Sequence, residues 1–125
     1  MSVATPVLVL PGIGNSGLQH WQSRWASRHP HWQRVNLGEW DRPVCDDWVR
    51  ALDVAVRACL SPPMLIAHSL ACLLVAHWAH RSALLPKGAF LVAVPDPESA
   101  SFPAKACGFA PVPMRPHGFP SIVVA

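Results

Sequence analysis

The sequence predicts an α/β fold of the doubly wound type, in which helices cover both faces of a mostly parallel sheet. Strand-length apolar runs alternate along the chain with segments whose apolar residues recur every three or four positions, which is the helical spacing. The apolar runs are nearly continuous, as expected for strands that are buried on both faces. Crossovers between parallel strands are right-handed, and the expected strand order is 2-1-3-4-5.

Five apolar runs are expected to form the strands. In chain order they read VLVL, RVNL, MLIAH, AFLVAV and SIVVA, at residues 7–10, 34–37, 64–68, 89–94 and 121–125. The last two runs are separated by residues 95–120, which are rich in proline and also contain glycine and alanine. This composition favours a segment that is mostly loop, with room for a short helix near residues 101–107.

Three segments have helical periodicity, at residues 18–28, 46–60 and 69–81. Asp46 and Asp47 suit the first turn of the second helix, where carboxylates meet the positive end of the helix dipole. The residues expected on the inward faces are Leu18, Trp21 and Trp25 in the first helix, Trp48, Leu52, Val56 and Cys59 in the second, and Leu70, Leu73, Leu74 and Trp78 in the third.

Size and composition indicate a single domain over residues 1–125. Apolar residues make up 51% of the chain and charged residues 14%, which allows a sizeable core and argues against disorder. The net charge is +3, but the arginines are scattered and form no charge run, so nucleic acid is not an expected partner. The N-terminus has no positively charged leader and its apolar run is too short to cross a membrane, so we expect a soluble, cytoplasmic protein.

The cysteines and histidines show no pattern of a disulfide framework or metal site. The four cysteines are widely spaced without a C-x-x-C pair, so reduced thiols are expected in a cytosolic protein. The histidine pairs have no further ligand cluster beside them, so packing or surface roles are expected and no metal is. These residues are Cys45, Cys59, Cys72 and Cys107, and the pairs His29 with His31 and His77 with His80.

The segment Ala67–Ala71, which reads AHSLA, contains a candidate nucleophile at Ser69, between the third expected strand and the third expected helix. A nucleophile elbow needs a serine on a sharp strand-to-helix turn, with small residues two positions before and after it. The familiar form is G-x-S-x-G, and here Ala67 and Ala71 replace the glycines. The first free N–H groups of the helix, Leu70 first, would then point at an oxyanion forming on a substrate. Alternatively, Ser69 only caps the helix. His68 is a poor candidate for the base because successive side chains in a strand point apart.

The loop after the first expected strand has three interpretations. Gly12, Gly14 and Gly17 match the dinucleotide-binding spacing G-x-G-x-x-G, and Glu39 lies at a suitable distance along the chain to reach a ribose hydroxyl. In a serine hydrolase, the same loop supplies the second oxyanion N–H, and Gly12 and Gly14 around Ile13 leave its backbone unobstructed. In the third interpretation the glycines only permit a tight strand-to-helix turn.

Five blocks, taken together and in this order, resemble one protein family. They are LPGIGNSGLQHWQSRW, EWDRPVCDDWV, LIAHSLACLLVAHWA, LVAVPDPE and GFAPVPMRPHGFPSIVVA. The chain resembles the small single-domain α/β-hydrolase-fold serine hydrolases related to retinoblastoma-binding protein nine, especially the bacterial members. The resemblance covers essentially the whole chain. It implies a Ser-His-Asp triad and hydrolysis of esters or related acyl compounds, without metal or cofactor.

The resemblance also implies roles for particular residues. Ser69 matches the nucleophile of the family, and Ile13 and Leu70 match the two backbone oxyanion positions. Ala71 stands where the family elbow has glycine. The acid of the family triad follows the strand that matches SIVVA, and the histidine follows one strand later. Neither has a counterpart here, so we expect the N-terminal two-thirds of the family fold, without its last strand and helices, and impaired activity.

Possible replacements for the missing acid and base are few. Asp96 follows the fourth expected strand at the correct edge of the sheet, although a tight turn is its expected role. His117 and His20 are the histidines on loops or helix ends that could approach Ser69, and neither has a motif behind it.

Two other functions are left open by the residues. One is a non-catalytic interaction protein on a remnant hydrolase fold, and the other is a nucleotide-binding flavodoxin-like domain. For the hydrolase, the expected partner is a small ester or acyl substrate. Because the fifth strand would be an uncovered apolar edge, we also expect a marginally stable protein or self-association through that strand.

Overall fold

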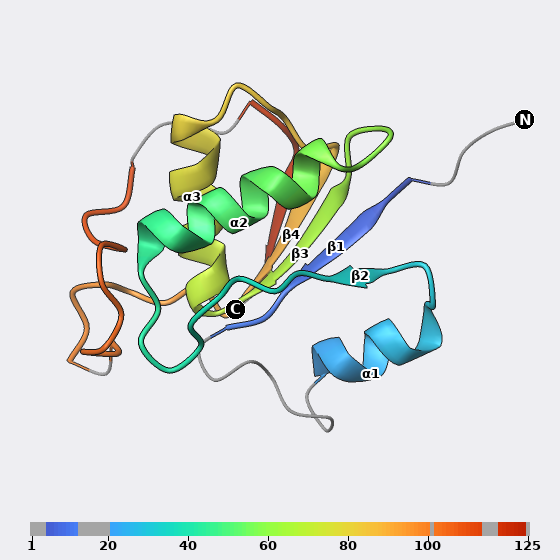
Figure 1. Cartoon of the computed structure of the whole chain (residues 1–125). Helices are drawn as coiled ribbons and strands as arrows, with labels where there is room; N and C mark the ends of the chain where they lie inside the picture. Colours follow the sequence, from blue (N-terminus) through green and yellow to red (C-terminus); the bar gives the residue numbers. More distant parts are fainter. Residues whose placement is uncertain (1–4, 13–20, 101, 114–117, 125) are drawn as a thin grey trace, which may run out of the picture.

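A computed structural model of the chain describes residues 5–12, 21–100, 102–113 and 118–124. Its centre is a five-stranded parallel sheet with the order β2-β1-β3-β4-β5, which confirms the predicted fold class and strand order (Figure 1). The elements in chain order are β1 (Val7–Leu10), α1 (Trp21–Arg28), β2 (Gln33–Arg34), α2 (Cys45–Arg57), β3 (Met64–His68), α3 (Leu70–Arg81), β4 (Gly88–Val92) and β5 (Ser121–Val124).

Alternate residues of the strands face two different helix layers, as the pleat requires. One set packs into a single core with α2 and α3, and its members are Leu8, Leu10, Leu65, Ala67, Ala89 and Leu91. On the opposite face, Trp25 of α1 stacks on Phe90 of β4, with ring centroids 5.9 Å apart. The sheet is therefore covered by two helices on one face and by α1 on the other.

The inward faces of α2 and α3 lie largely where their periodicity predicted. Trp48, Leu52 and Val56 of α2 are buried, and the four predicted residues of α3 are also buried, namely Leu70, Leu73, Leu74 and Trp78. In α1, Trp25 is 39% exposed, so its inward placement was only partly correct. Leu18 lies outside the described residues.

Several predicted boundaries were wrong, for local reasons. The second strand ends at Arg34 because the chain leaves the sheet after the bond from Val35 N–H to Val9 O, 3.0 Å long. Helix α2 ends at Arg57, and Cys59 lies beyond it, ahead of two prolines that cannot continue a helix. Strand β4 ends at Val92 because Ala93 adopts a φ of 57°, outside the extended region.

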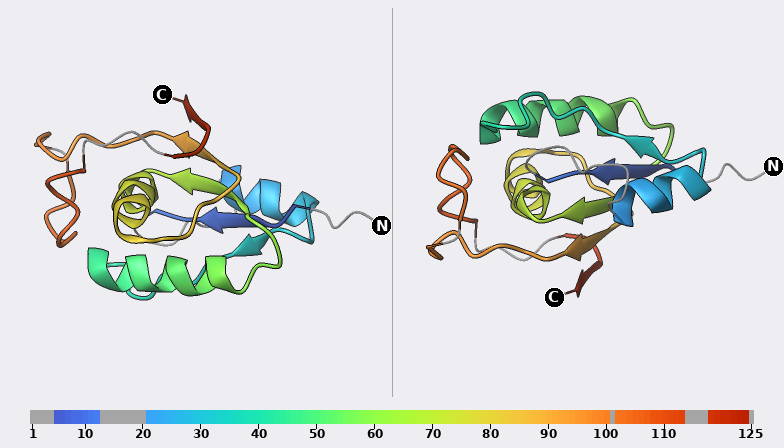
Figure 2. Two further views of the ribbon diagram at one scale, coloured as in Figure 1. Left: turned by 90° about the horizontal axis from the view of Figure 1, so that it is seen from above. Right: turned by 90° about the horizontal axis from the view of Figure 1, so that it is seen from below.

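The segment between β4 and β5 is loop over residues 102–107, as its composition favoured, and the short helix for which it had room does not form there. Isolated turns occur instead, with bonds from Phe102 N–H to Ser99 O and from Ala106 N–H to Pro103 O. Figure 2 shows the orange part of this segment beyond the carboxyl ends of the strands, and β5 outermost in the sheet beside β4.

The described residues were also compared with the requirements of a membrane-spanning helix, a metal site and a disulfide bond. None of the described helices is long and apolar enough to cross a membrane. No group of three or more potential metal ligands occurs within the described parts of the chain. All four cysteines are free thiols.

Candidate active site

Ser69 stands at the turn between β3 and α3 in a backbone conformation that is rare for residues with a side chain. Its φ is 55° and its ψ is −121°. Such a conformation costs about 1–3 kcal/mol and persists only where the surrounding structure enforces it. Here both backbone groups of Ser69 are held by hydrogen bonds. Its N–H donates to Val92 O of β4 (2.9 Å), and its carbonyl accepts from Cys72 N–H of α3 (2.9 Å).

The hydroxyl of Ser69 is not used to cap the helix. Ser69 occupies the N-cap position of α3, but its side chain makes no capping hydrogen bond. The alternative interpretation of this residue as a simple helix cap therefore lacks the contact that defines a cap.

The residues two positions away from Ser69 are completely buried alanines. Ala67 and Ala71 are each 0% exposed, so a larger side chain at either position would have to displace core atoms. Leu70 is also 0% exposed, and its side chain anchors the first turn of α3 in the core. The turn thus has the small flanking residues that a nucleophile elbow requires.

A buried thiol adds a further restraint behind the turn. Cys72 Sγ contacts Val92 O at 3.4 Å and Ala67 O at 3.6 Å, linking the first turn of α3 to both neighbouring strands. Burial raises the pKa of the Cys72 thiol to about 12. The sulfur is therefore a neutral thiol at physiological pH and serves packing rather than nucleophilic chemistry.

Gly12, which follows β1 after one residue, lies directly against this turn. A Cβ atom placed on Gly12 would be 3.1 Å from His68 O and 3.3 Å from Ser69 Cβ. Both distances are shorter than ordinary van der Waals contacts, so a side chain at position 12 would push against the turn at Ser69. The structure therefore brings Gly12 and Ser69 together at the carboxyl end of the sheet, at the β1–β3 switch point of the winding.

The other predicted residues of this loop, Ile13 and Gly14, lie outside the described residues, as do Gly17, His20 and His117. Their roles stay predictions. Glu39, which the dinucleotide interpretation needs, accepts a hydrogen bond from Asp41 N–H (3.2 Å) through its own carboxylate.

Gln22 is a residue of the site that the sequence analysis did not identify. This α1 side chain is 0% exposed, and its amide nitrogen donates to Leu10 O (3.0 Å) and Ile66 O (3.1 Å). The two carbonyls belong to β1 and β3, shortly before Gly12 and Ser69. Gln22 therefore ties α1 to the ends of the two strands that carry the candidate site. A single glutamine in a helical segment gives no sequence signal for such a bridge.

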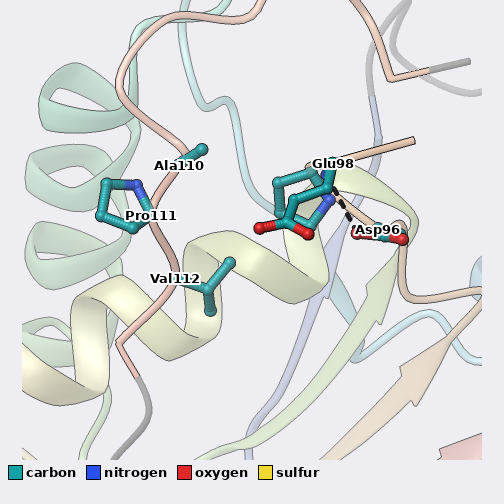
Figure 3. Close-up of a pocket in the computed structure, with 6 residues that line it drawn as sticks. Asp96, Glu98, Ala110, Pro111 and Val112 are labelled. Carbon is teal, nitrogen blue, oxygen red and sulfur yellow. Dashed lines mark hydrogen bonds between the residues drawn. The ribbon is translucent and has the colours of Figure 1, made fainter. Parts of the chain in front are cut away.

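Asp96 fills the turn role expected for it. Its carboxylate accepts a hydrogen bond from Glu98 N–H (2.9 Å), and its carbonyl accepts one from Ser99 N–H (3.0 Å). Asp96 and Glu98 line one side of a pocket of about 590 Å³, and Ala110, Pro111 and Val112 line the other (Figure 3). No hydrogen bond joins Asp96 to a histidine among the described residues, so the structure supplies no evidence that it replaces the acid.

The described histidines near the core have structural partners. His77 is buried, and its Nε2 lies 2.8 Å from Phe109 O, in the segment after β4. His68 Nδ1 would lie 3.6 Å from a Cβ on Gly12, so the His68 ring lies beside Gly12. Within the described residues, no hydrogen bond joins the hydroxyl of Ser69 to a histidine or a carboxylate.

Comparison with known proteins places the chain in a family. A family model of serine hydrolases matches residues 7–125. A solved structure from Pectobacterium atrosepticum, assigned as a YdeN-like hydrolase, is 30% identical, with a TM-score of 0.81 over 97% of this chain and 62% of that one. The ydeN gene product of B. subtilis is 22% identical, with a TM-score of 0.62 over 73% of this chain and 52% of that one, a likeness of fold alone.

This chain therefore spans less than two thirds of the length of either solved structure. No curated protein gives a significant match. The narrower relation to retinoblastoma-binding protein nine stays a prediction. The family match over nearly the whole sequence and the YdeN-like structure at 30% identity show that the chain belongs to the serine hydrolase family.

Proposed function

We propose that this chain carries the nucleophile and oxyanion half of a serine hydrolase that acts on carboxylic esters or related acyl compounds. Ser69 is the nucleophile in this proposal, and the backbone N–H groups of Leu70 and Ile13 form the oxyanion hole. Gly12, Gly14, Ala67 and Ala71 supply the unobstructed turns. The observation that carries the proposal is the strained backbone of Ser69, with its hydroxyl free of a capping bond and Gly12 packed against it.

The arrangement suits acyl transfer for a chemical reason. The serine oxygen attacks the carbonyl carbon of an ester, the bond to the alcohol breaks, and negative charge gathers on the carbonyl oxygen. Leu70 begins α3, so its N–H is one of the free donors at the positive end of the helix. Donors fixed in this position stabilise the developing charge without reorganising during the reaction.

The hydroxyl also needs a base, and this requirement limits the expected rate. A serine is a weak nucleophile until a base takes its proton, and loss of a triad member typically costs on the order of 10⁴-fold or more in kcat. Since no hydrogen bond joins the Ser69 hydroxyl to a histidine within the described residues, we expect acylation of this chain to be slow and deacylation slower still.

Acetylation by p-nitrophenyl acetate tests the proposal without requiring turnover. Intact-mass spectrometry should show one acetyl group per chain, and peptide mapping should place it on Ser69, with one equivalent of p-nitrophenolate released. Ser69→Ala should abolish this modification. Ser27→Ala, which changes an exposed serine of α1 whose hydroxyl donates to Arg24 O, should leave it unchanged.

Equal acetylation of the wild type and Ser69→Ala, or modification spread over lysines, would contradict the assignment of Ser69. If a folded wild-type chain is not acetylated at all, the hydrolase proposal fails for this molecule. The alternative, a non-catalytic interaction protein on a hydrolase fold, would then be favoured.

A further inference from the structure

Gln22 of α1 is a polar side chain enclosed at the carboxyl edge of the sheet. It is 0% exposed, and its Nε2 lies 3.0 Å from Leu10 O of β1 and 3.1 Å from Ile66 O of β3. Both partners are acceptors, so the amide nitrogen must face them, and both of its hydrogens are used. One amide group therefore joins two neighbouring strands and leaves neither of its donors unsatisfied.

The two carbonyl groups lie where β1 and β3 lead into the candidate site. The parallel pairing of these strands ends with Leu10 opposite Ala67. Gly12 comes two residues after Leu10, and Ser69 comes three residues after Ile66. Gln22 thus holds the two strands together just before the chain reaches the close approach of Gly12 to Ser69.

Helix α1 has a second anchor on the sheet, which does not involve the site. Trp25 stacks on Phe90 of β4, with ring centroids 5.9 Å apart, and meets Trp32 edge to face at 6.4 Å. An apolar side chain at position 22 would add to such an attachment without the cost of burying an amide. The choice of a buried amide that satisfies two backbone acceptors therefore favours a role in the geometry of the strand ends.

We propose that Gln22 is a positioning residue for the acylation of Ser69, an inference that rests on the function proposed above. Its two hydrogen bonds fix the separation of the ends of β1 and β3, and through them the distance between Gly12 and Ser69. The proposed oxyanion donors, the N–H groups of Ile13 and Leu70, each come directly after one of these two residues. The distance therefore sets how well both donors reach one oxygen atom, and a displacement of about 1 Å can cost about 10²-fold in rate.

Gln22 also holds one end of the connection from β1 to α1. The connection starts after Leu10, the last residue of β1, and leads to α1, whose second residue is Gln22. Because Gln22 donates to Leu10 O, both ends of the connection are fixed at the same strand end. Loss of this bond would release the helical end while Gly12 stays beside Ser69.

Acetylation kinetics of Gln22→Met test the proposal. Methionine is similar to glutamine in length and is flexible, but it has no N–H donor, so it should remain buried while both bonds are lost. We expect the maximal rate of Ser69 acetylation by p-nitrophenyl acetate to fall about 10- to 100-fold, with the half-saturating ester concentration unchanged. Gln33→Met is the matched control, since Gln33 is exposed in β2, and it should react as the wild type does.

Amide hydrogen exchange provides a second readout that needs no reaction. Ser69 N–H, which bonds to Val92 O, should exchange about 10-fold faster in Gln22→Met than in the wild type. Met64 N–H bonds to Pro6 O (2.8 Å) at the opposite end of the β1–β3 pair and should keep its wild-type rate. If Gln22 contributed only to overall stability, the exchange rates of both amides would rise together.

Gln22→Asn is a second variant that keeps an amide in the core, should Gln22→Met fail to fold. Its side chain is shorter by one methylene group and cannot span both carbonyl oxygens, so acetylation of Ser69 should again be slower than in the wild type. A wild-type acetylation rate in either folded variant, or equal acceleration of exchange at Ser69 and Met64, would overturn the positioning role.

Failure of the proposed function would be distinguishable from failure of this inference. If the folded wild type is not acetylated, the proposed function fails, and the exchange rates alone decide the role of Gln22. Faster exchange at Ser69 without a change at Met64 would then show that Gln22 fixes the turn, and an unchanged rate at Ser69 would overturn the inference as well.

Discussion

Ser69 holds its backbone in a region that glycine occupies without strain, and this conformation gives a prediction for stability. Replacing Ser69 by glycine should raise the free energy of unfolding by about 1 kcal/mol, because relief of strain outweighs the greater entropy of the unfolded chain. Ser69→Ala keeps a Cβ in the same position and should leave the free energy of unfolding within about 0.5 kcal/mol of the wild type. Urea denaturation measures both changes, and a Ser69→Gly protein less stable than the wild type would show that the turn is not strained.

Gly12 is the second residue on which the geometry of the site depends. Gly12→Ala would place a methyl group 3.1 Å from a backbone oxygen, His68 O, which cannot move without displacing the turn at Ser69. We expect destabilisation of about 1–3 kcal/mol and a slower reaction of Ser69 with p-nitrophenyl acetate. Gly118→Ala is the control, since its methyl group would lie 3.6 Å from a flexible leucine side chain, Leu85. Equal acylation rates in the two variants would contradict the close approach of Gly12 to the turn at Ser69.

Thiol reactivity tests the environment of Cys72 directly. Burial raises the pKa of Cys72 to about 12 and that of Cys45 to about 11. At pH 8 both should therefore resist iodoacetamide in the folded protein and react only after denaturation, whereas the exposed Cys107 should react at once. Rapid alkylation of Cys72 in the native state would show that the thiol behind the turn is not buried. Because the folded pKa of Cys72 is raised, its contribution to the free energy of unfolding is fully present below pH 9.0, the ordinary pKa of a thiol. That contribution is lost as the pH rises through the folded pKa.

At the scale of elements, Asp53 of α2 links this helix to α3 through hydrogen bonds. Its carboxylate accepts hydrogen bonds from Ser82 Oγ (2.6 Å), Trp78 Nε1 (3.0 Å) and Arg57 Nε (3.0 Å). Hydrogen bonds from Ser82, Trp78 and Arg57 lower the pKa of Asp53 below its ordinary value of 3.8, with that from Ser82 the largest cause. Because the folded pKa is lowered, the stabilisation is complete above pH 3.8 and is lost as the pH falls through the folded value.

We therefore expect Asp53→Asn to reduce the free energy of unfolding by about 1–3 kcal/mol at neutral pH, with the difference from the wild type shrinking as the pH falls below 3.8. Asp47→Asn, at an exposed position on the same helix, is the control. Urea midpoints of the wild type and both variants, measured across this pH range, test the prediction. A stability difference between the wild type and Asp53→Asn that does not change with pH would show that the charge of Asp53 does not cause the stabilisation.

The elements differ in how far the sequence determined them. Strand β3 and helix α3 were predicted almost to the residue, because a buried strand followed by a helix with a clear apolar face leaves little ambiguity. Strand β2 was misplaced because Val35 and Leu37 are buried by tertiary packing after the strand has ended, and burial alone does not distinguish strand from loop. The optional short helix does not form over residues 102–107, because single turns closed by Ser99 O and Pro103 O satisfy backbone groups there instead.

Part of the candidate site could also be predicted from the sequence. The turn at Ser69 and the neighbouring Gly12 follow from local residue size and from the strand order, both of which can be read from the sequence. The bridge made by Gln22 could not be predicted, because it depends on how α1 is placed over the ends of β1 and β3, a property of the assembled layers.

At the scale of the whole molecule, the doubly wound topology joins sites that are far apart in the chain. Gly12, just after β1, meets the turn after β3 because these two strands are neighbours in the sheet, although a helix, a strand and a second helix separate them in sequence. The same topology leaves β5 at one edge of the sheet.

The central claim is that the fold singles out one serine among the ten in the chain. Its most direct test is reaction of the folded protein with excess fluorophosphonate, followed by peptide mapping of every serine. The oxygen of the reactive serine displaces fluoride from phosphorus, which leaves a stable adduct that reports attack without requiring turnover. The account predicts one adduct, on Ser69, absent in Ser69→Ala. Adducts spread over several serines, or a single adduct at another serine, would contradict it.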